Sequence, residues 1–350
     1  MDMVFDGHND VLLRLWRERQ EGGNPFRDFI EGTSAGHIDL PRARRGGLSG
    51  GLCAIYIPSP HDFNLKHPDA NGHYETPLDP PLERQSSLDI ALGMAALAQQ
   101  VERAGGWKLC RSTADIRSAM ADNVFAAVLH MEGCEAIGAD LDALEVFYAA
   151  GLRSLGPVWS RHNIFGHGVP FAYPSSPDTG PGLTAAGDAL VKACNELGIL
   201  IDLAHITEKG FWDVARLSDQ PLIASHTNAH ALTPVARNLT DKQLDAIKES
   251  QGLVGLNYAV TMLRADGADN ADTPLSDMLR HIDYLVERIG IDCVALGSDF
   301  DGATIPEIIG DASGNQRLIE ALRDRGYGQA DLDKICRENW LRVLGSAWHE

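Results

Sequence analysis

Short apolar segments alternate with amphipathic segments along nearly the whole chain. The apolar segments are rich in residues that favour β-strands and are bounded by turn-forming residues. They predict eight strands, at 3–8, 50–57, 124–132, 152–159, 198–205, 221–226, 252–258 and 293–300. The amphipathic segments between them have the apolar spacing of helices. Several are bounded by threonines that suit a helix N-cap and by glycines that suit a helix end, namely Thr184, Thr207, Thr240, Gly151, Gly198 and Gly290.

Helices between nearly all of the predicted strands indicate a parallel sheet. An eight-fold repeat of strand and helix closes naturally as a (β/α)8 barrel of the TIM type, with its active site at the carboxyl ends of the strands. We therefore expect one α/β domain over residues 1–350. An open doubly wound sheet is the alternative, but no G-x-G-x-x-G motif follows any predicted strand, so dinucleotide binding has no support.

Two long segments, 58–84 and 160–183, interrupt the repeat of strands and helices. Loops of this length in a compact domain are usually either functional lids or disordered. The second segment contains aromatic residues and residues typical of turns. We expect it to cover the substrate.

The charge of the chain narrows the choice of partners. The chain has 30 Lys and Arg residues and 49 Asp and Glu residues, which gives a net charge of −19. This charge argues against nucleic acid and anionic membranes as binding partners, because both bind to basic patches. No apolar run approaches the roughly 20 residues of a transmembrane helix, and no signal peptide is recognisable at the N-terminus. The six cysteines are scattered along the chain and form no C-x-x-C pair. We expect them to be free thiols, as is usual for proteins of a reducing compartment. We expect a cytoplasmic protein, and a homodimer is compatible with the sequence.

Side chains that bind metals lie where the apolar strands end. His8 and Asp10 end the first strand and point the same way, because successive side chains of a strand alternate between its faces. The other strand-end donors are Glu132, His205, His226 and Asp299. Imidazole together with carboxylate is the ligand set of zinc or a similar divalent ion. Six such residues at strand ends predict a metal site at this end of the barrel.

The number of donors predicts two metal ions. Six exceed the three protein ligands that one catalytic zinc usually takes. A carboxylate shared between two ions about 3.5–4 Å apart accounts for the surplus. Water bridging such a pair would be largely hydroxide at neutral pH and would attack a carbonyl or phosphoryl centre. The residues therefore point to metal-assisted hydrolysis.

Five motifs make the chain resemble the membrane (renal) dipeptidase family of zinc metallopeptidases, family M19 of the amidohydrolase superfamily. They are DGHND, MEG, IDLAH, SH followed by ARN, and GSDFDG, in the order and spacing of that family. The resemblance extends over nearly the whole chain. It implies a (β/α)8 barrel, two zinc ions per chain and hydrolysis of dipeptides.

The resemblance also implies a role for each metal ligand. The His and Asp of the family's first motif bind one zinc and match His8 and Asp10 here. The family's Glu after the third strand bridges both ions and matches Glu132. Its two later histidines bind the second zinc and match His205 and His226.

Three further residues are implied by the same resemblance. Asp299, in GSDFDG, matches the Asp that handles protons beside the bridging hydroxide. Arg237, eleven residues after His226, matches the Arg that holds the substrate's C-terminal carboxylate. A fixed guanidinium suits a bidentate contact with a carboxylate, although a surface ion pair is the alternative for Arg237. Tyr258 matches a substrate-contacting Tyr less closely, and packing is an alternative for it.

One position departs from the family, which commonly has a His at the end of the fourth strand to stabilise the oxyanion. Without gaps, that place holds Trp159, and the nearest histidine is His162. A short gap would bring His162 into register; otherwise Arg161, His162 or His167 would supply the donor differently. We take His162 as the candidate, beside Asp299 and Glu132 as catalytic residues.

Two other functions compete with a zinc dipeptidase. The first is another hydrolase of the amidohydrolase superfamily that acts on an N-acyl amino acid, a lactam or a phosphoester. A carboxylate-holding Arg237 disfavours neutral phosphoesters but not lactams. The second is a binding protein on a barrel that has lost catalysis. Loss of catalysis normally removes ligands, whereas all six remain here.

Overall fold

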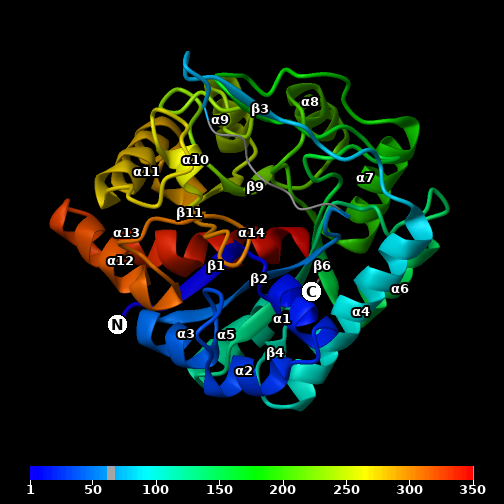
Figure 1. Cartoon of the computed structure of the whole chain (residues 1–350), viewed down its shortest axis with the longest axis horizontal. Helices are drawn as coiled ribbons and strands as arrows, with labels where there is room; N and C mark the ends of the chain where they lie inside the picture. Colours follow the sequence, from blue (N-terminus) through cyan, green and yellow to red (C-terminus); the bar gives the residue numbers. More distant parts are fainter. Residues whose placement is uncertain (61–67, 350) are drawn as a thin grey trace.

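Parallel strands form the centre of the fold (Figure 1). The structure, a computed structural model, describes residues 1–60 and 68–349. The central strands are β1 (Val4–Asn9), β2 (Leu48–Tyr56), β5 (Ala126–Glu132), β6 (Leu152–Gly156), β8 (Leu200–Ile201), β9 (Ile223–Thr227), β10 (Leu253–Leu256) and β11 (Val294–Leu296). Each overlaps one of the predicted strands.

The central strands close into a barrel. One sheet has the order β1-β2-β5-β6-β8 and a second has the order β11-β10-β9. Parallel bridges between Asn9 and Phe300 and between Asp202 and Ile223 join the two sheets at both of their edges. The α/β barrel predicted from the sequence is thereby confirmed.

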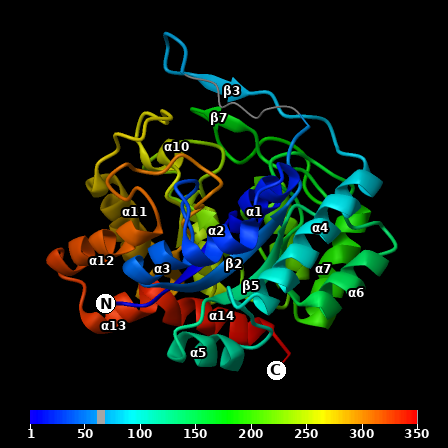
Figure 2. The same ribbon diagram turned by 60° about the horizontal axis from the view of Figure 1, so that its bottom comes forward.

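Helices surround the barrel (Figures 1 and 2). The longer ones are α1 (Val11–Gln20), α4 (Arg84–Arg103), α5 (Thr113–Ala121), α6 (Asp142–Ala150), α7 (Ala185–Leu197), α8 (Glu208–Leu217), α9 (Asp241–Glu249), α11 (Leu275–Ile289), α12 (Asn315–Asp324) and α14 (Asn339–Ala347). The shorter ones are α2 (Pro25–Glu31), α3 (Leu40–Gly46), α10 (Val260–Leu263), α13 (Gln329–Asp333), two 3-10 turns (Ile291–Cys293 and Ala312–Gly314) and a π-helical turn (Lys334–Glu338). Among the described residues, no helix combines the length and the apolar character needed to cross a lipid bilayer.

The predicted helix boundaries have the expected local chemistry. The Thr184 side chain accepts the backbone N–H of Gly187 at the start of α7, and Thr207 accepts that of Gly210 at the start of α8. Such caps satisfy N–H groups that have no partner within the helix. Gly198 ends α7 in the left-handed conformation, which glycine adopts without steric cost.

Apolar side chains fill the barrel interior at the end opposite the candidate site. Trp340 of α14 is fully buried there, and its indole N–H donates to the carbonyl of Leu296, 2.9 Å away. Gly7 of β1 faces this indole so closely that an added Cβ would collide with it. All six cysteines are buried and unpaired. The interior is therefore a packed core and not a channel.

The two long loops meet each other, which the sequence did not predict. Residues of the first loop form β3 (Tyr74–Thr76), which pairs antiparallel with β7 (Phe171–Tyr173) of the second. The pair lies beyond the ends of the barrel strands in Figure 2. Residues 61–67 of the first loop lie outside the described residues. A short strand β4 (Lys108–Leu109), which pairs with β5, was also not predicted.

Candidate active site

The six strand-end donors come together at one end of the barrel. His8 lies in β1 and Asp10 directly after it, while Glu132 is the last residue of β5. The remaining donors follow or lie in β8, β9 and β11: His205, His226 and Asp299. All are buried except Asp299, which is partly exposed. Closure of the barrel thus gathers residues that are up to 291 positions apart in the sequence.

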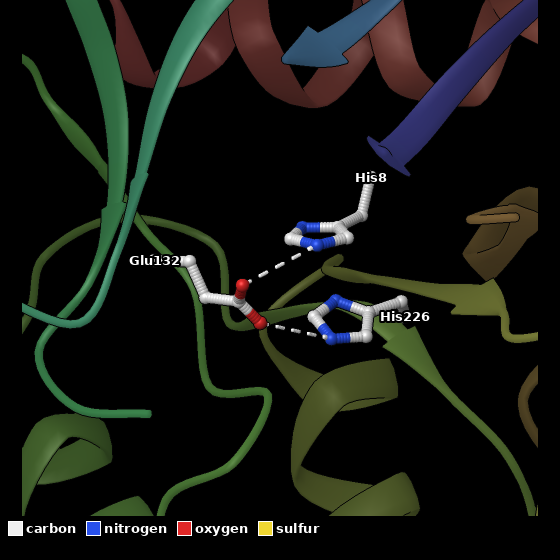
Figure 3. A group of neighbouring side chains, drawn as sticks. All are labelled: His8, Glu132 and His226. Atoms are coloured by element: carbon white, nitrogen blue, oxygen red, sulfur yellow. Dashed lines mark ion pairs between the residues drawn. The ribbon is translucent and has the colours of Figure 1, made fainter. Parts of the chain in front are cut away.

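Glu132 lies between two groups of ligands (Figure 3). Its Oε1 is 3.0 Å from Nε2 of His205 and 3.5 Å from Nε2 of His226. Its Oε2 instead faces His8, whose Nε2 is 3.7 Å away. The two oxygens of one carboxylate therefore point to different sets of nitrogen donors.

A second set of donors lies on the His8 side of Glu132. Nε2 of His8 is 3.3 Å from Oδ2 of Asp10. One ligand atom from each of His8, Asp10 and Asp299 lies within 4.8 Å of the others, as does one from each of His8, Glu132 and His226. On the other side, the Nε2 atoms of His205 and His226 are only 3.1 Å apart. The candidate ligands therefore form two groups with Glu132 between them.

Burial and charge shift the pKa values of these groups. Burial raises the pKa of Glu132 well above its usual value, and the carboxylate of Asp10 raises it further. Burial lowers the pKa values of His205 and His226 well below the usual value, so both rings are neutral. Burial also lowers the pKa of His8, but the neighbouring carboxylates, Glu132 foremost, outweigh burial and raise it to about 10. Converging carboxylates therefore favour a cation in this space.

The residues present fit a metal centre. Neither ring nitrogen of His8 has a hydrogen-bond partner among the described residues, and neither does Oδ1 of Asp10, although all three atoms are buried. Unpartnered buried polar atoms are costly unless another group satisfies them. Neutral imidazoles and carboxylates are ligands of zinc. His8, Asp10, Glu132, His205 and His226 thus have the chemistry of metal ligands, and His8 and Asp10 also have buried atoms without a partner among the described residues.

Serines orient the two histidines that face Oε1 of Glu132. The Ser160 hydroxyl lies 2.9 Å from Nδ1 of His205, and the Ser225 hydroxyl lies 2.7 Å from Nδ1 of His226. Ser225 also donates to Oδ2 of Asp202, 2.5 Å away. Such partners fix the ring orientation of metal-binding histidines. The sequence reasoning missed these partners, although Ser225 and Asp202 lie within the SH and IDLAH motifs.

Asp299 is held in a specific position at the rim of the site. Its backbone lies in the left-handed region, with φ of 59°, and its N–H donates to the carbonyl of His8, 3.0 Å away. The Asn257 amide donates to its Oδ2 at 2.9 Å, which leaves Oδ1 for other chemistry. Burial raises the pKa of Asp299, and the nearby Asp10 adds to this effect. Left-handed backbone at a residue other than glycine often marks a functional site.

A cavity of about 400 Å³ opens beside the ligand group. Glu132, His205 and Asp299 contribute to its lining. Tyr56, Trp159 and Phe171 also line it, and we call these three residues the aromatic wall. Neighbouring rings within the wall are in contact, with centroids 5.3 Å and 5.4 Å apart. The cavity thus offers charged groups and an apolar surface to one small molecule.

Arg237, between β9 and α9, lines the same cavity and is 5% exposed. One of its N–H groups donates to the carbonyl of His226 at 3.3 Å, and Nε is buried without a partner among the described residues. Burial lowers the pKa of Arg237 to about 10, against the opposing influence of Asp299 and Glu132. The side chain is still cationic at neutral pH. A buried cation with unmet hydrogen bonds can hold an anionic group of a ligand.

Two candidate residues lie away from the cavity. His162 is exposed and stacks on His167, with ring centroids 5.4 Å apart, whereas Trp159 lines the cavity. The structure therefore does not bring His162 to the site, because the chain turns outward after Arg161. Tyr258 is 1% exposed, packs edge-on against Phe300 and does not line the cavity, so its contact with substrate stays a prediction.

Comparisons with known proteins agree with this geometry. The family model for membrane dipeptidases (peptidase family M19) matches residues 2–349. The chain is 50% identical in sequence to a metallo peptidase from Rhodobacter sphaeroides, whose crystal structure was solved with a phosphinate mimic of the dipeptide L-Ala-D-Ala. That comparison covers 99% of each chain with a TM-score of 0.94.

Two further relatives point the same way. The crystal structure of a metallo peptidase of family M19, dipeptidase AC, is 51% identical, with a TM-score of 0.93 over 100% of this chain and 99% of the other. The dipeptidase aclJ of Aspergillus oryzae is 28% identical over 99% of this chain and 78% of its own length. Both similarities extend over nearly the whole of this chain.

Proposed function

Because the chain belongs to the membrane dipeptidase family, peptidase family M19, we propose that it hydrolyses dipeptides at a site for two zinc ions. The family establishes a metallopeptidase of the dipeptidase type. One observation carries the finer proposal: the two carboxylate oxygens of Glu132 face different groups of ligands. A single metal ion would need only one of these two groups of ligands.

His8 and Asp10 would hold one ion, His205 and His226 the other, and Glu132 both. Zinc bound by these residues would supply Lewis-acid chemistry, which polarises a carbonyl and lowers the pKa of water. The hydroxyls of Ser160 and Ser225 keep Nδ1 of their histidines occupied, so that Nε2 faces Glu132. The resident groups thus need little rearrangement when metal binds.

Asp299 would move the proton during hydrolysis. Asn257 holds its Oδ2, which leaves Oδ1 to accept a proton from the attacking water and deliver it to the leaving amine. A carboxyl group whose pKa is raised by burial is a better proton acceptor than an exposed one. His162 has no part in this proposal, because its side chain does not reach the cavity.

Arg237 would hold the C-terminal carboxylate of the substrate. Its unpartnered Nε and its position in the cavity lining support this role. Phe171 belongs to β7 of the loop 160–183 and lines the same cavity, which supports the prediction that this loop covers the substrate. Together these groups would orient one short peptide and exclude water around it.

The test is metal-dependent hydrolysis. Protein freed of metal with EDTA should not cleave Ala-Ala, and added zinc should restore cleavage as about two ions bind per chain. N-acetylalanine and a bicyclic β-lactam whose second ring carries a carboxylate serve as the matched alternatives, since both present a carboxylate without a free amine. Full activity without metal, saturation at one ion, or cleavage of the alternatives in preference to Ala-Ala would each contradict the proposal.

A further inference from the structure

Arg161 is a fully buried cation that lies outside the cavity lining and has no part in the mechanism above. Its Nη2 lies 3.0 Å from Oε1 of Glu135, which is also buried. The same Nη2 donates to the carbonyl of Ile57 at 2.9 Å, and Nη1 donates to the hydroxyl of Ser59 at 2.9 Å. One side chain therefore ties together the segments that follow β2, β5 and β6.

These segments carry most of the aromatic wall. Tyr56 precedes Ile57 at the end of β2, and Trp159 lies two residues before Arg161. The guanidinium carbon of Arg161 lies 5.0 Å from the centroid of the Trp159 ring, within the range of a cation–π contact. Ser59, which Arg161 holds directly, lines the cavity as well. Arg161 therefore contacts the back of the surface that the cavity presents to a ligand.

We propose that Arg161 is a positioning residue, which holds the aromatic wall in place as the subsite for an apolar side chain of the dipeptide. The inference rests on the proposed function and adds a substrate preference to it. Rigid aromatic surfaces favour apolar groups, and a binding surface is selective only when its supporting contacts fix it. Arginine suits this role because its planar fork reaches several acceptors at once, which a lysine ammonium on a flexible stem does not.

The test compares Arg161→Met/Glu135→Met with wild type. Both charges are removed together, because a single substitution would leave an uncompensated buried charge and destabilise the fold. Arg161→Lys is the conservative variant. Arg153→Met is the matched control, since Arg153 also lies over an aromatic ring, that of Tyr148 at 4.2 Å, but does not line or adjoin the cavity. Zinc content and thermal unfolding confirm that each variant is folded and loaded.

Kinetics on Gly-Gly, Leu-Gly and Gly-Leu give the first readout. The double variant should keep kcat/KM on Gly-Gly close to wild type. It should lose about ten- to a hundred-fold on a leucine dipeptide, mainly through KM, which is the range for apolar side-chain discrimination. Arg161→Lys should recover part of this loss, and Arg153→Met should show none. An equal loss on all three dipeptides, or no loss on any, would overturn the proposal.

Acrylamide quenching of tryptophan fluorescence gives a second readout that does not depend on activity. If Arg161 holds the wall, quenching should increase in the double variant, and this increase should vanish when Trp159→Phe is added. Unchanged quenching would refute the positioning role even if kinetics changed. Failure of wild type to cleave any of the three dipeptides would refute the proposed function instead, and quenching would still decide the role of Arg161.

Discussion

Replacing Arg237 by Ala should remove the group that recognises the C-terminal carboxylate of the substrate. Arg237 is 5% exposed and its Nε has no partner among the described residues, so a bound carboxylate would contact a largely desolvated cation. Breaking such a charge pair costs about 2–5 kcal/mol. Since each 1.4 kcal/mol corresponds to about a factor of ten, kcat/KM should fall by roughly thirty- to several-thousand-fold.

The decisive assay changes the protein and the substrate together. Wild type should lose a similar factor when Ala-Ala is replaced by Ala-Ala amide, because the amide removes the anion. For Arg237→Ala, kcat/KM should then fall little further when the amide replaces Ala-Ala. The two changes are expected to be non-additive because each removes one partner of the same interaction. Tripeptides should be poor substrates as well, because their carboxylate lies one residue farther from the scissile bond.

Arg17→Ala is the matched control for this assay. Arg17 lines the same cavity but is exposed, so its loss changes the local charge without removing a buried contact. It should lower kcat/KM only slightly, and by the same factor for both substrates. The reasoning is refuted if wild type cleaves dipeptide amides as well as dipeptides, or if the losses from Arg237→Ala and from amidation simply multiply.

Three further substitutions test the other assignments. Asp299→Asn should leave the zinc content near that of wild type but lower kcat by about 10²–10⁴-fold, because an amide cannot carry the proton; loss of zinc would make Asp299 chiefly a ligand. Glu132→Gln should lower the zinc content, measured by elemental analysis, more than either His205→Ala or His226→Ala, because Glu132 would serve both ions; two ions retained per chain would contradict the bridging role. Tyr258→Phe should keep kcat/KM near wild type and cost about 1 kcal/mol or less of unfolding free energy, since the contact of its hydroxyl with Asn315 is 3.4 Å long; a large loss of activity at full stability would instead support contact of Tyr258 with the substrate.

The barrel, and the end of it at which the candidate metal ligands gather, could be predicted because both depend on local patterns. Alternating strands and helices restrict the chain to few topologies, and parallel strands place their carboxyl ends at one end of a barrel. A histidine or carboxylate at a strand end, such as His8 or Glu132, is therefore placed near the others before any distance is known. The caps at Thr184 and Thr207 were predictable for the same reason, since each involves only neighbouring residues.

Contacts between segments far apart in the sequence were decided only by the tertiary structure. The pairing of β3 with β7 joins two loops about a hundred residues apart, and no local pattern specifies such a partner. Likewise, counting without gaps placed Trp159 at the end of the fourth strand, and His162 was chosen as the nearest histidine, but the path of the chain after Trp159 turns His162 outward and Arg161 inward. Sequence periodicity determines which face of a regular element a residue occupies. In an irregular loop, the direction of each side chain depends on the packing and hydrogen bonds around it, and these exist only once the barrel has closed.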